Sequence, residues 1–220
     1  MKYLRIVFIS SFILLVATSN IYSQSRFGFH LGTAIPLYSG FYMVNEYSSD
    51  PTIGFNVGME YSYRFPDKGI GIFTAIDFMY NGISKDYKEE VEKYELPLMG
   101  ATPEYHEYYS IPFSTGVHYA YRLNDNLVLS SNAGLTVNCL IITDLDLGLY
   151  KFSTEPAFSL GGRVGVGLII NNRLSINLDY LGLGSHTLNV TTIQEPILIE
   201  DEWSKDFSVH MLTLTAAIYF

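Results

Sequence analysis

The amino-acid sequence predicts an all-β fold, an eight-stranded antiparallel up-and-down transmembrane β-barrel. Apolar residues alternate with small or polar residues over eight segments, and long and short connections alternate between those segments. Charged residues make up 16% of the chain, whereas a soluble domain has about 25%. A protein surrounded by water rarely has so few charged side chains, so we expect lipid around much of this surface.

The first residues predict a secretory signal peptide. Lys2 and Arg5 precede an apolar run from Ile6 to Ala17, and small residues follow that run. Cleavage after Ser19 and cleavage after Ser23 both fit the small-residue preference. The predicted division is a signal peptide at residues 1–23 and one barrel domain at residues 24–220. The apolar run is shorter than the roughly 20 residues of a transmembrane helix.

Eight extended segments follow from the alternation of apolar and polar residues with a period of two. They are Arg26 to Ile35, Thr52 to Phe65, Gly69 to Ile83, Tyr105 to Leu123, Leu127 to Ile142, Pro156 to Ile170, Arg173 to Leu183 and Phe207 to Phe220. The second segment shows the pattern fully. Ile53, Phe55, Val57, Met59, Tyr61, Tyr63 and Phe65 share one face, and Thr52, Gly54, Asn56, Gly58, Glu60, Ser62 and Arg64 share the other.

The later segments repeat this division between an apolar face and a face of small or polar residues. Ile70, Ile72, Ile76, Phe78 and Tyr80 share the apolar face of the third segment, and Phe113, Val117, Tyr119 and Tyr121 that of the fourth. Leu129, Leu135 and Val137 mark it in the fifth, and Leu160, Val164, Val166, Leu174, Ile176, Leu178 and Tyr180 mark it in the sixth and seventh. Tyrosines gather near the segment ends, as the interfacial girdles of a membrane barrel require.

Short and long connections alternate along the chain. The short ones are PDK at residues 66–68, NDN at 124–126 and NN at 171–172, all rich in turn-forming residues. The long ones span 36–51, 84–104, 143–155 and 182–206. An up-and-down barrel with this alternation has its short turns and both termini on the periplasmic side and its long loops outside.

The face opposite the apolar one indicates which side meets lipid. A soluble lipocalin-like barrel, which remains the alternative architecture, points its apolar face inward and needs Lys, Glu and Asp outside. Here the second face consists mostly of Gly, Ser, Asn and Thr. Small polar side chains suit the crowded interior of a narrow barrel, so we expect the apolar face to contact lipid.

The end of the chain carries a resemblance to a known family. In LTLTAAIYF, Leu212, Leu214, Ala216, Ile218 and Phe220 share one face, and the chain stops at an aromatic residue. Together with SIPFSTGVHYAYRLNDNLVLSSNAGLTVN at residues 110–138, this resembles the small eight-stranded bacterial outer-membrane β-barrel proteins of the OmpX-like and PorT-like kind.

That resemblance implies a location in the bacterial outer membrane. It also implies that Leu214, Ala216, Ile218 and Phe220 form a C-terminal signal read by the barrel-assembly machinery. The PorT-like members imply a role in secretion or surface assembly. Within the stretch quoted above, Pro112 is expected to mark a β-bulge, because proline lacks the N–H that a closed ladder needs.

Seven charged or titratable residues fall on the predicted inner face. They are Glu60, Arg64, Asp77, His118, Arg122, Arg163 and Asp179. An eight-stranded barrel is just wide enough for side chains to fill, and the three acids equal the three arginines in number, so we expect them to pair. Arg163 and Asp179 lie diagonally across the turn at Asn171 and predict one such ion pair. A narrow ion or proton path through these groups is the alternative.

The sequence argues against several other classes of function. Removal of Lys2 and Arg5 lowers the basic count from 13 to 11 against 22 acids, which changes the formal charge from −9 to about −11. This charge disfavours nucleic-acid binding. The single cysteine, Cys139, makes no intramolecular disulfide, and GGRVGVG at residues 161–167 lacks nucleotide-loop spacing. We predict no catalytic residue, cofactor or metal.

A lipid-modifying barrel enzyme is the chemical alternative. Its nearest local candidates are Ser185 and His186, but neighbours on a strand point to opposite faces. Outside the strands, the spacing of Tyr87, Val91 and Tyr94 predicts a short helix within residues 86–96, which would cap the barrel or meet a partner. The predicted function is non-enzymatic: long extracellular loops contact an envelope or surface component, with outer-membrane lipid and a protein as partners.

Overall fold

The computed structural model describes residues 25–37, 41–44, 47–66, 68–94, 103–148, 150–194 and 199–220. The predicted signal peptide and both cleavage sites lie outside these residues. Eight long strands form the barrel: β1 (Ser25–Pro36), β4 (Gly54–Arg64), β5 (Ile70–Asn81), β6 (Tyr108–Arg122), β7 (Leu127–Ile142), β10 (Ala157–Ile170), β11 (Leu174–Gln194) and β12 (Ile199–Tyr219).

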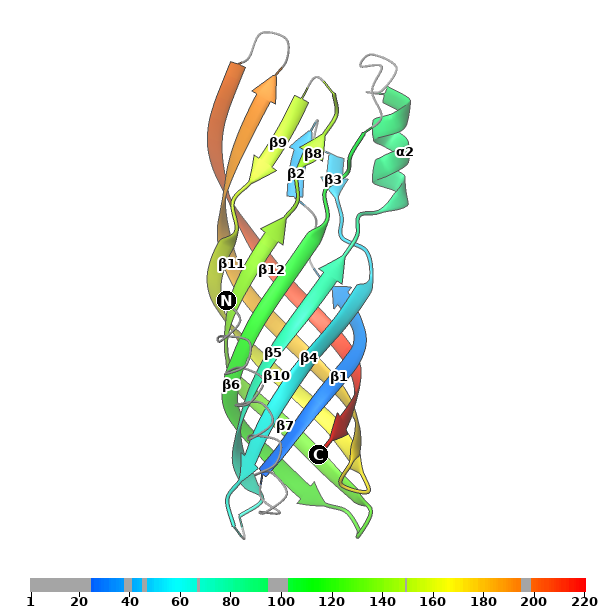
Figure 1. Ribbon diagram of the computed structural model, residues 1–220, viewed down its shortest axis with the longest axis vertical. Coiled ribbons are helices and arrows are strands. Elements are labelled where there is room, and N and C mark those ends of the chain that lie inside the picture. Colours follow the sequence, from blue (N-terminus) through cyan, green and yellow to red (C-terminus); the bar gives the residue numbers. More distant parts are fainter. Residues whose placement is uncertain are drawn as a thin grey trace, which may run out of the picture.

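Each barrel strand is antiparallel to its neighbours, and the ring closes between β1 and β12 and between β10 and β11 (Figure 1). Neighbours in the ring are neighbours in the sequence, which confirms the predicted eight-stranded up-and-down barrel. Among the described residues, no helix is long and apolar enough to cross a membrane.

The outward faces of these strands carry the large apolar side chains. Leu31, Leu135, Phe158 and Leu160 expose 63–71% of their surfaces. Similar side chains surround the wall, whereas soluble monomers rarely expose apolar patches larger than a few hundred Å². This apolar belt is the predicted lipid-facing surface.

Aromatic side chains mark the extracellular edge of the belt. The Phe55 and Tyr80 rings lie 5.4 Å apart, and the Tyr80 and Tyr109 rings 5.3 Å apart. Both tyrosine hydroxyls donate to the Glu107 carboxylate over 2.7 Å. These hydrogen bonds hold the pKa of Glu107 below its ordinary value. The girdle therefore has apolar rings toward lipid and a charged acceptor toward water.

Two of the short turns have the backbone conformations that their residues favour. Asn171 and Asn172 have positive φ values of 51° and 58°, which asparagine tolerates better than most residues. In the 124–126 turn, the Asn124 side chain accepts hydrogen bonds of 2.9 Å from the backbone N–H groups of Asn126 and Leu127. The predicted turns at 124–126 and 171–172 are confirmed.

The bulge expected at Pro112 is wrong. Pro112 pairs with Asn138 of β7 in an unbroken register. On the other side, the register between β5 and β6 is the same above and below it, with Ile76 opposite Phe113 and Met79 opposite Ser110. The proline therefore removes ladder contacts with β5 without adding a residue to the strand.

The expected loop at 182–206 is also wrong, because most of it is strand. The β11–β12 pairing continues to Gln194 and Ile199. A bulge lies between Gly182 and Gly184, and Gly184 has φ +85°, a conformation that side-chain-bearing residues rarely adopt. The two strands thereby continue far beyond the apolar belt.

The bulge explains why the alternation concealed this extension. Below it, even-numbered residues of β11 such as Leu178 and Tyr180 point outward. Above it, the even-numbered Leu188 and Val190 are buried, because one extra residue turns the stripe from the outer to the inner face. The apolar stripe therefore leaves the lipid and becomes part of an extracellular core.

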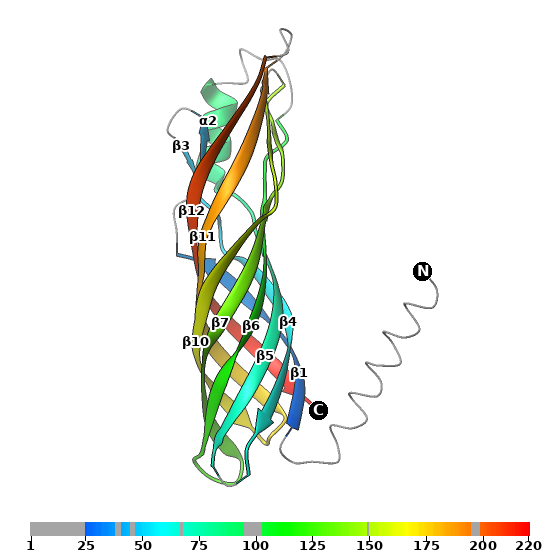
Figure 2. The ribbon, with the colours of Figure 1, turned by 90° about the vertical axis from the view of Figure 1, so that its left-hand side faces the viewer.

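Smaller elements cover the outer end of the barrel. They are β2 (Phe41–Val44), β3 (Tyr47–Ser49), α2 (Lys85–Tyr94), β8 (Leu145–Asp146) and β9 (Tyr150–Thr154). Strand β9 pairs with β11, from Val190 opposite Thr154 to Gln194 opposite Tyr150, and β8 pairs with β9. Figure 1 shows the two long strands rising at one side of this end and α2 at the other, and Figure 2 shows the same strands from their own side.

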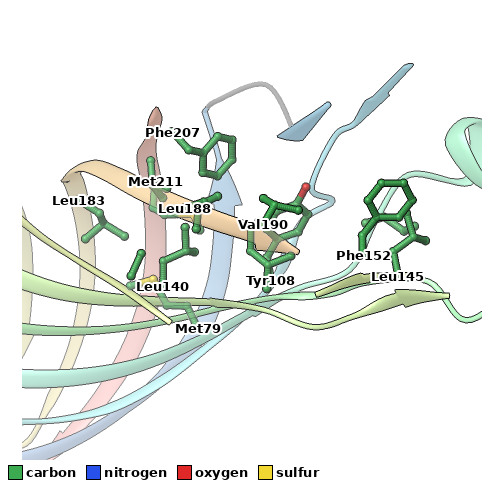
Figure 3. Packing of buried hydrophobic residues seen from close by; sticks show 14 of the residues in the cluster. Met79, Tyr108, Leu140, Leu145, Phe152, Leu183, Leu188, Val190, Phe207 and Met211 are labelled. Carbon is green, nitrogen blue, oxygen red and sulfur yellow. The ribbon is translucent and has the colours of Figure 1, made fainter. Parts of the chain in front are cut away.

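The predicted helix within residues 86–96 is confirmed by α2. Tyr87 and Val91 expose only 2% and 3% of their surfaces, while the side chain of Tyr94 lies outside the described part. Both buried residues join one apolar cluster, the cap cluster, that fills the outer end (Figure 3). Its labelled members are Met79, Tyr108, Leu140, Leu145, Phe152, Leu183, Leu188, Val190, Phe207 and Met211. The helix therefore packs on the barrel as a cap.

We expect the cap to lose stability in acid because of His106. This histidine is fully buried beside the Tyr108 hydroxyl, 3.3 Å from its Nε2, and burial lowers its pKa to about 4 from an ordinary 6.5. The unfolded chain therefore binds more protons between these values. The free energy of unfolding should fall by about 3 kcal/mol as the pH drops from about 6.5 to about 4.

Urea unfolding of wild type and His106→Leu over this pH range measures the effect. The carboxylates titrate in both proteins, so the difference between the two slopes isolates His106. Equal slopes would contradict the assignment.

Candidate functional site

An ionic network occupies the middle of the lumen. Arg163 of β10 lies between two buried carboxylates. Its Nε is 3.1 Å from Asp179 Oδ1, its Nη2 is 3.0 Å from Asp179 Oδ2, and its Nη1 is 3.2 Å from Asp77 Oδ2. The three side chains are exposed by 5% or less. The predicted diagonal pair of Arg163 and Asp179 is present, and one arginine serves two acids.

Further residues complete the network and were absent from the predicted set. His30 Nε2 lies 2.7 Å from Asp77 Oδ1, to which Asn56 also donates over 3.1 Å. Asn132 donates to Asp179 Oδ1 over 2.9 Å. Buried charges require such partners. Strand parity in the sequence already places two of these residues inside the barrel. His30 shares its strand face with the inward-facing Ala34, and Asn56 shares its face with Glu60.

The other predicted members lie closer to the periplasmic end and do not join these contacts. Glu60 has no ion pair within the described part of the chain, and neither do Arg64 and Arg122. His118 Nε2 is 3.4 Å from the Tyr63 carbonyl, and Arg122 is exposed. The expected pairing of the three acids with the three arginines is therefore present only in part, because Arg163 binds both aspartates.

An apolar layer lies directly above the network. Met79 follows Asp77 by two residues on the same face of β5, and Leu181 follows Asp179 in the same way on β11. Both are at most 1% exposed. Leu140, Leu183 and Met211, each fully buried, extend this layer across the lumen (Figure 3). Ions avoid apolar surroundings, so this layer makes the described part of the lumen above the network unfavourable for an ion.

The histidine considered for an enzyme lies inside the barrel near its outer end. His186 is fully buried and Ser185 is exposed, so the two point apart as expected. His186 Nε2 lies 2.7 Å from Ser159 Oγ and 3.0 Å from Asn138 Nδ2, and its Nδ1 is 3.4 Å from the Phe207 carbonyl. These contacts satisfy a buried imidazole with neutral partners.

The extension of β11 and β12 forms a second candidate site. We call residues Ser185–Gln194 of β11 and Ile199–Ser208 of β12, with β8 and β9, the platform. Ten residues of strand span about 30 Å, so it rises well above the belt. Its Leu188, Val190 and Phe207 side chains are buried in the cap cluster.

The opposite face of the platform is polar and exposed. Thr187 donates to Asp206 over 2.8 Å, and Asn189 donates to Glu155 over 3.3 Å. A shallow depression of about 310 Å³ lies on this side. It is lined by Glu155, Asn189, Val190, Thr191, Glu202 and Ser204. The sheet therefore presents ordered hydroxyl, amide and carboxylate groups to the solvent.

The C-terminal stripe lies on the outer wall. Leu214, Ile218 and Phe220 expose 45–53% of their surfaces, and Ala216 is also exposed. Residues 211–219 of β12 pair with β1 and close the ring. The stripe is thus part of the apolar belt at the closing seam.

Solved structures with the same fold are outer-membrane barrels. The chain aligns with OprG from Pseudomonas aeruginosa at 11% identity and a TM-score of 0.52, covering 90% of this chain and 96% of that one. It aligns with a major outer membrane protein from Thermus thermophilus at 13% identity and a TM-score of 0.49, covering 89% and 99%. The chain has the fold of a small outer-membrane β-barrel. With the apolar belt, this fold places it in the bacterial outer membrane.

A third solved structure, Neisserial surface protein A, aligns at 14% identity and a TM-score of 0.46, covering 89% of this chain and 97% of that one. No protein-family model matches the sequence, and no curated protein matches it significantly.

Proposed function

We propose that this barrel is non-enzymatic and carries a rigid platform outside the cell that binds an envelope or surface component. The observation that carries this proposal is the continuation of β11 and β12 beyond the lipid belt. The platform buries apolar side chains on one face and leaves a polar face exposed. A preformed surface binds with less ordering cost than a loose loop.

The charge of the polar face indicates the chemistry of the partner. Glu155, Glu202 and Asp206 are exposed there, and Glu155 and Glu202 line the depression. The whole chain is also acidic, with a formal charge of −9. Complementary charge speeds association and sets specificity, so we infer a partner with basic or hydroxyl-rich groups. The PorT-like resemblance supports a component of surface assembly.

Photo-crosslinking on intact cells tests this function. A benzophenone amino acid replaces Ser204, Asp206 or Ser208 on the platform, and Val166 in the belt provides the control. We expect discrete high-mass adducts from the platform positions and none from Val166, which faces lipid. If all three platform variants are folded and exposed yet form no adducts, the proposal is wrong.

We also propose that the closed lumen does not conduct, against the narrow-channel alternative. Fully buried Met79, Leu140 and Met211 lie across the path above the network. In planar bilayers we expect no current above the lipid baseline for wild type or Glu60→Gln. Steady conductance that changes in Glu60→Gln would favour the channel.

The lipid-modifying alternative has its own test. It predicts that His186→Gln or His118→Gln abolishes a lipid modification while the barrel stays folded. The barrel-assembly machinery is proposed to read the stripe of Leu214, Ala216, Ile218 and Phe220.

A further inference from the structure

The periplasmic mouth of the lumen gathers cationic side chains. Arg26 is the second residue of β1, and Arg64 and Arg122 end β4 and β6. Arg26, Arg64 and His118 line one cavity of about 40 Å³. The chain as a whole carries a formal charge of −9. The arginines at this mouth therefore form a positively charged region on a chain that is negatively charged as a whole.

These arginines form no ion pair with an acid among the described residues. In that part of the chain, no carboxylate lies within 4 Å of Arg26, Arg64 or Arg122. Arg26 donates to Asn172 Oδ1 over 3.1 Å, and the buried Nε of Arg64 finds no hydrogen-bond acceptor on any described residue. Unsatisfied buried donors are uncommon and costly. A bound anion would supply a negative charge for the arginines and a hydrogen-bond acceptor for the Arg64 Nε.

The acids that line the cavity do not supply that acceptor. Asp179 is engaged by Arg163 at 3.0 Å, and Glu60 forms no ion pair with the residues that the structure describes. Glu60 lines the same cavity, and its carboxylate repels a bound anion whenever it is ionised.

The backbone between Arg64 and His118 is shaped for close approach. Gly71 pairs with Arg64 on one side and with His118 on the other. A Cβ on Gly71 would lie 2.2 Å from His118 Nε2, so only glycine lets the imidazole cross toward Arg64. The row of Arg64, Gly71 and His118 thus places the imidazole and the guanidinium along one cavity.

We propose that this mouth binds a small oxyanion carrying a phosphate group, held by Arg26, Arg64 and His118 with Arg122 at the rim. Guanidinium groups bind phosphate oxygens through paired charge-assisted hydrogen bonds. One buried water requires about 10–15 Å³ of cavity volume. The observed 40 Å³ therefore admits about three waters or one tetrahedral anion. The source is free inorganic phosphate or a phosphate on a larger periplasmic molecule.

Calorimetric titration with inorganic phosphate tests the site, using the full chain in uncharged maltoside micelles. We expect one phosphate per barrel, and a loss of affinity of at least about tenfold in Arg26→Gln and in Arg64→Gln. Arg173→Gln is the matched control, because Arg173 is exposed beside the 171–172 turn and does not line the cavity. Its affinity should be unchanged.

A fourth variant keeps the test decisive if either arginine variant fails to fold. Glu60→Gln removes any charge from this carboxyl group, so phosphate should bind at least as tightly as to wild type. Absence of binding in both wild type and Glu60→Gln would overturn the proposal. So would equal weakening in Arg173→Gln, which would indicate nonspecific attraction. Competition by a phosphate-bearing glycan fragment at lower concentration than phosphate would identify the larger molecule as the source.

Discussion

Replacement of Arg163 by leucine is expected to lower the free energy of unfolding by about 3–5 kcal/mol. The substitution leaves Asp77 and Asp179 buried, at 2% and 0% exposure, without the cation that binds both. The remaining partners, such as His30 and Asn132, each contact only one of the two carboxylates. Two neighbouring anions would then share a narrow lumen, and the folded barrel should become the minority species in moderate urea.

A triple variant separates the charge effect from lost packing. In Arg163→Leu combined with Asp77→Asn and Asp179→Asn, no buried charge remains unpaired among these three positions. Neutral replacement of a whole buried ionic group is often close to neutral in stability, so most of the loss should be recovered. The exposed Arg173→Gln serves as the surface control and should change stability by less than about 0.5 kcal/mol.

The folded fraction in increasing urea, read from the heat-dependent mobility of the barrel on gels, measures these differences. A loss below about 1 kcal/mol in Arg163→Leu, or no recovery in the triple variant, would show that the network does not hold the lumen together.

Replacement of Gly184 by valine is expected to displace the platform and to lower stability by about 3 kcal/mol or more. Gly184 has φ +85°, and a Cβ there would lie 2.4 Å from the Leu160 carbonyl oxygen and 3.1 Å from the Ser159 Cβ. Backbone strain and overlap with a neighbouring strand therefore act together. The bulge that turns Leu188 and Val190 inward cannot keep its shape.

Gly182 provides the matched control on the same bulge. A Cβ at Gly182 would meet no atom nearer than 3.7 Å, so Gly182→Ala should leave both stability and crosslinking unchanged. In Gly184→Val we expect loss of the adducts from Ser204 along with earlier unfolding in urea. Wild-type crosslinking and an unchanged urea midpoint in Gly184→Val would contradict the role assigned to the bulge.

The strand faces could be predicted from the sequence because lipid and lumen impose opposite chemistry on alternate residues. Ile72 and Ile76 point outward while Asp77 points inward, as their parity predicts. The pair of Arg163 and Asp179 was also predictable, because both flank one short turn. The contact of His30 with Asp77 spans 47 residues, and strand parity places both inside without fixing which side chains meet.

The platform escaped prediction for a different reason. Below the bulge the even-numbered apolar residues of β11 face lipid. Above it even-numbered residues such as Leu188 and Val190 are buried in the cap cluster. A single extra residue between Gly182 and Gly184 reverses which residues of β11 point inward. Two glycines separated by one residue do not by themselves predict such a bulge. On β12 the same parity points inward throughout, and no bulge is needed. The buried residues change from Thr213 and Thr215 in the lumen to Val209 and Phe207 in the cap cluster.

Electrophoresis of the membrane fraction with and without heating tests whether the apolar face of this barrel contacts lipid. A lipid-facing barrel resists detergent until it is boiled, so the unheated protein should migrate differently from the heated one and should sediment with the outer membrane. The same mobility in both samples, with the protein in the soluble fraction, would mean that the apolar residues face a protein core and not lipid.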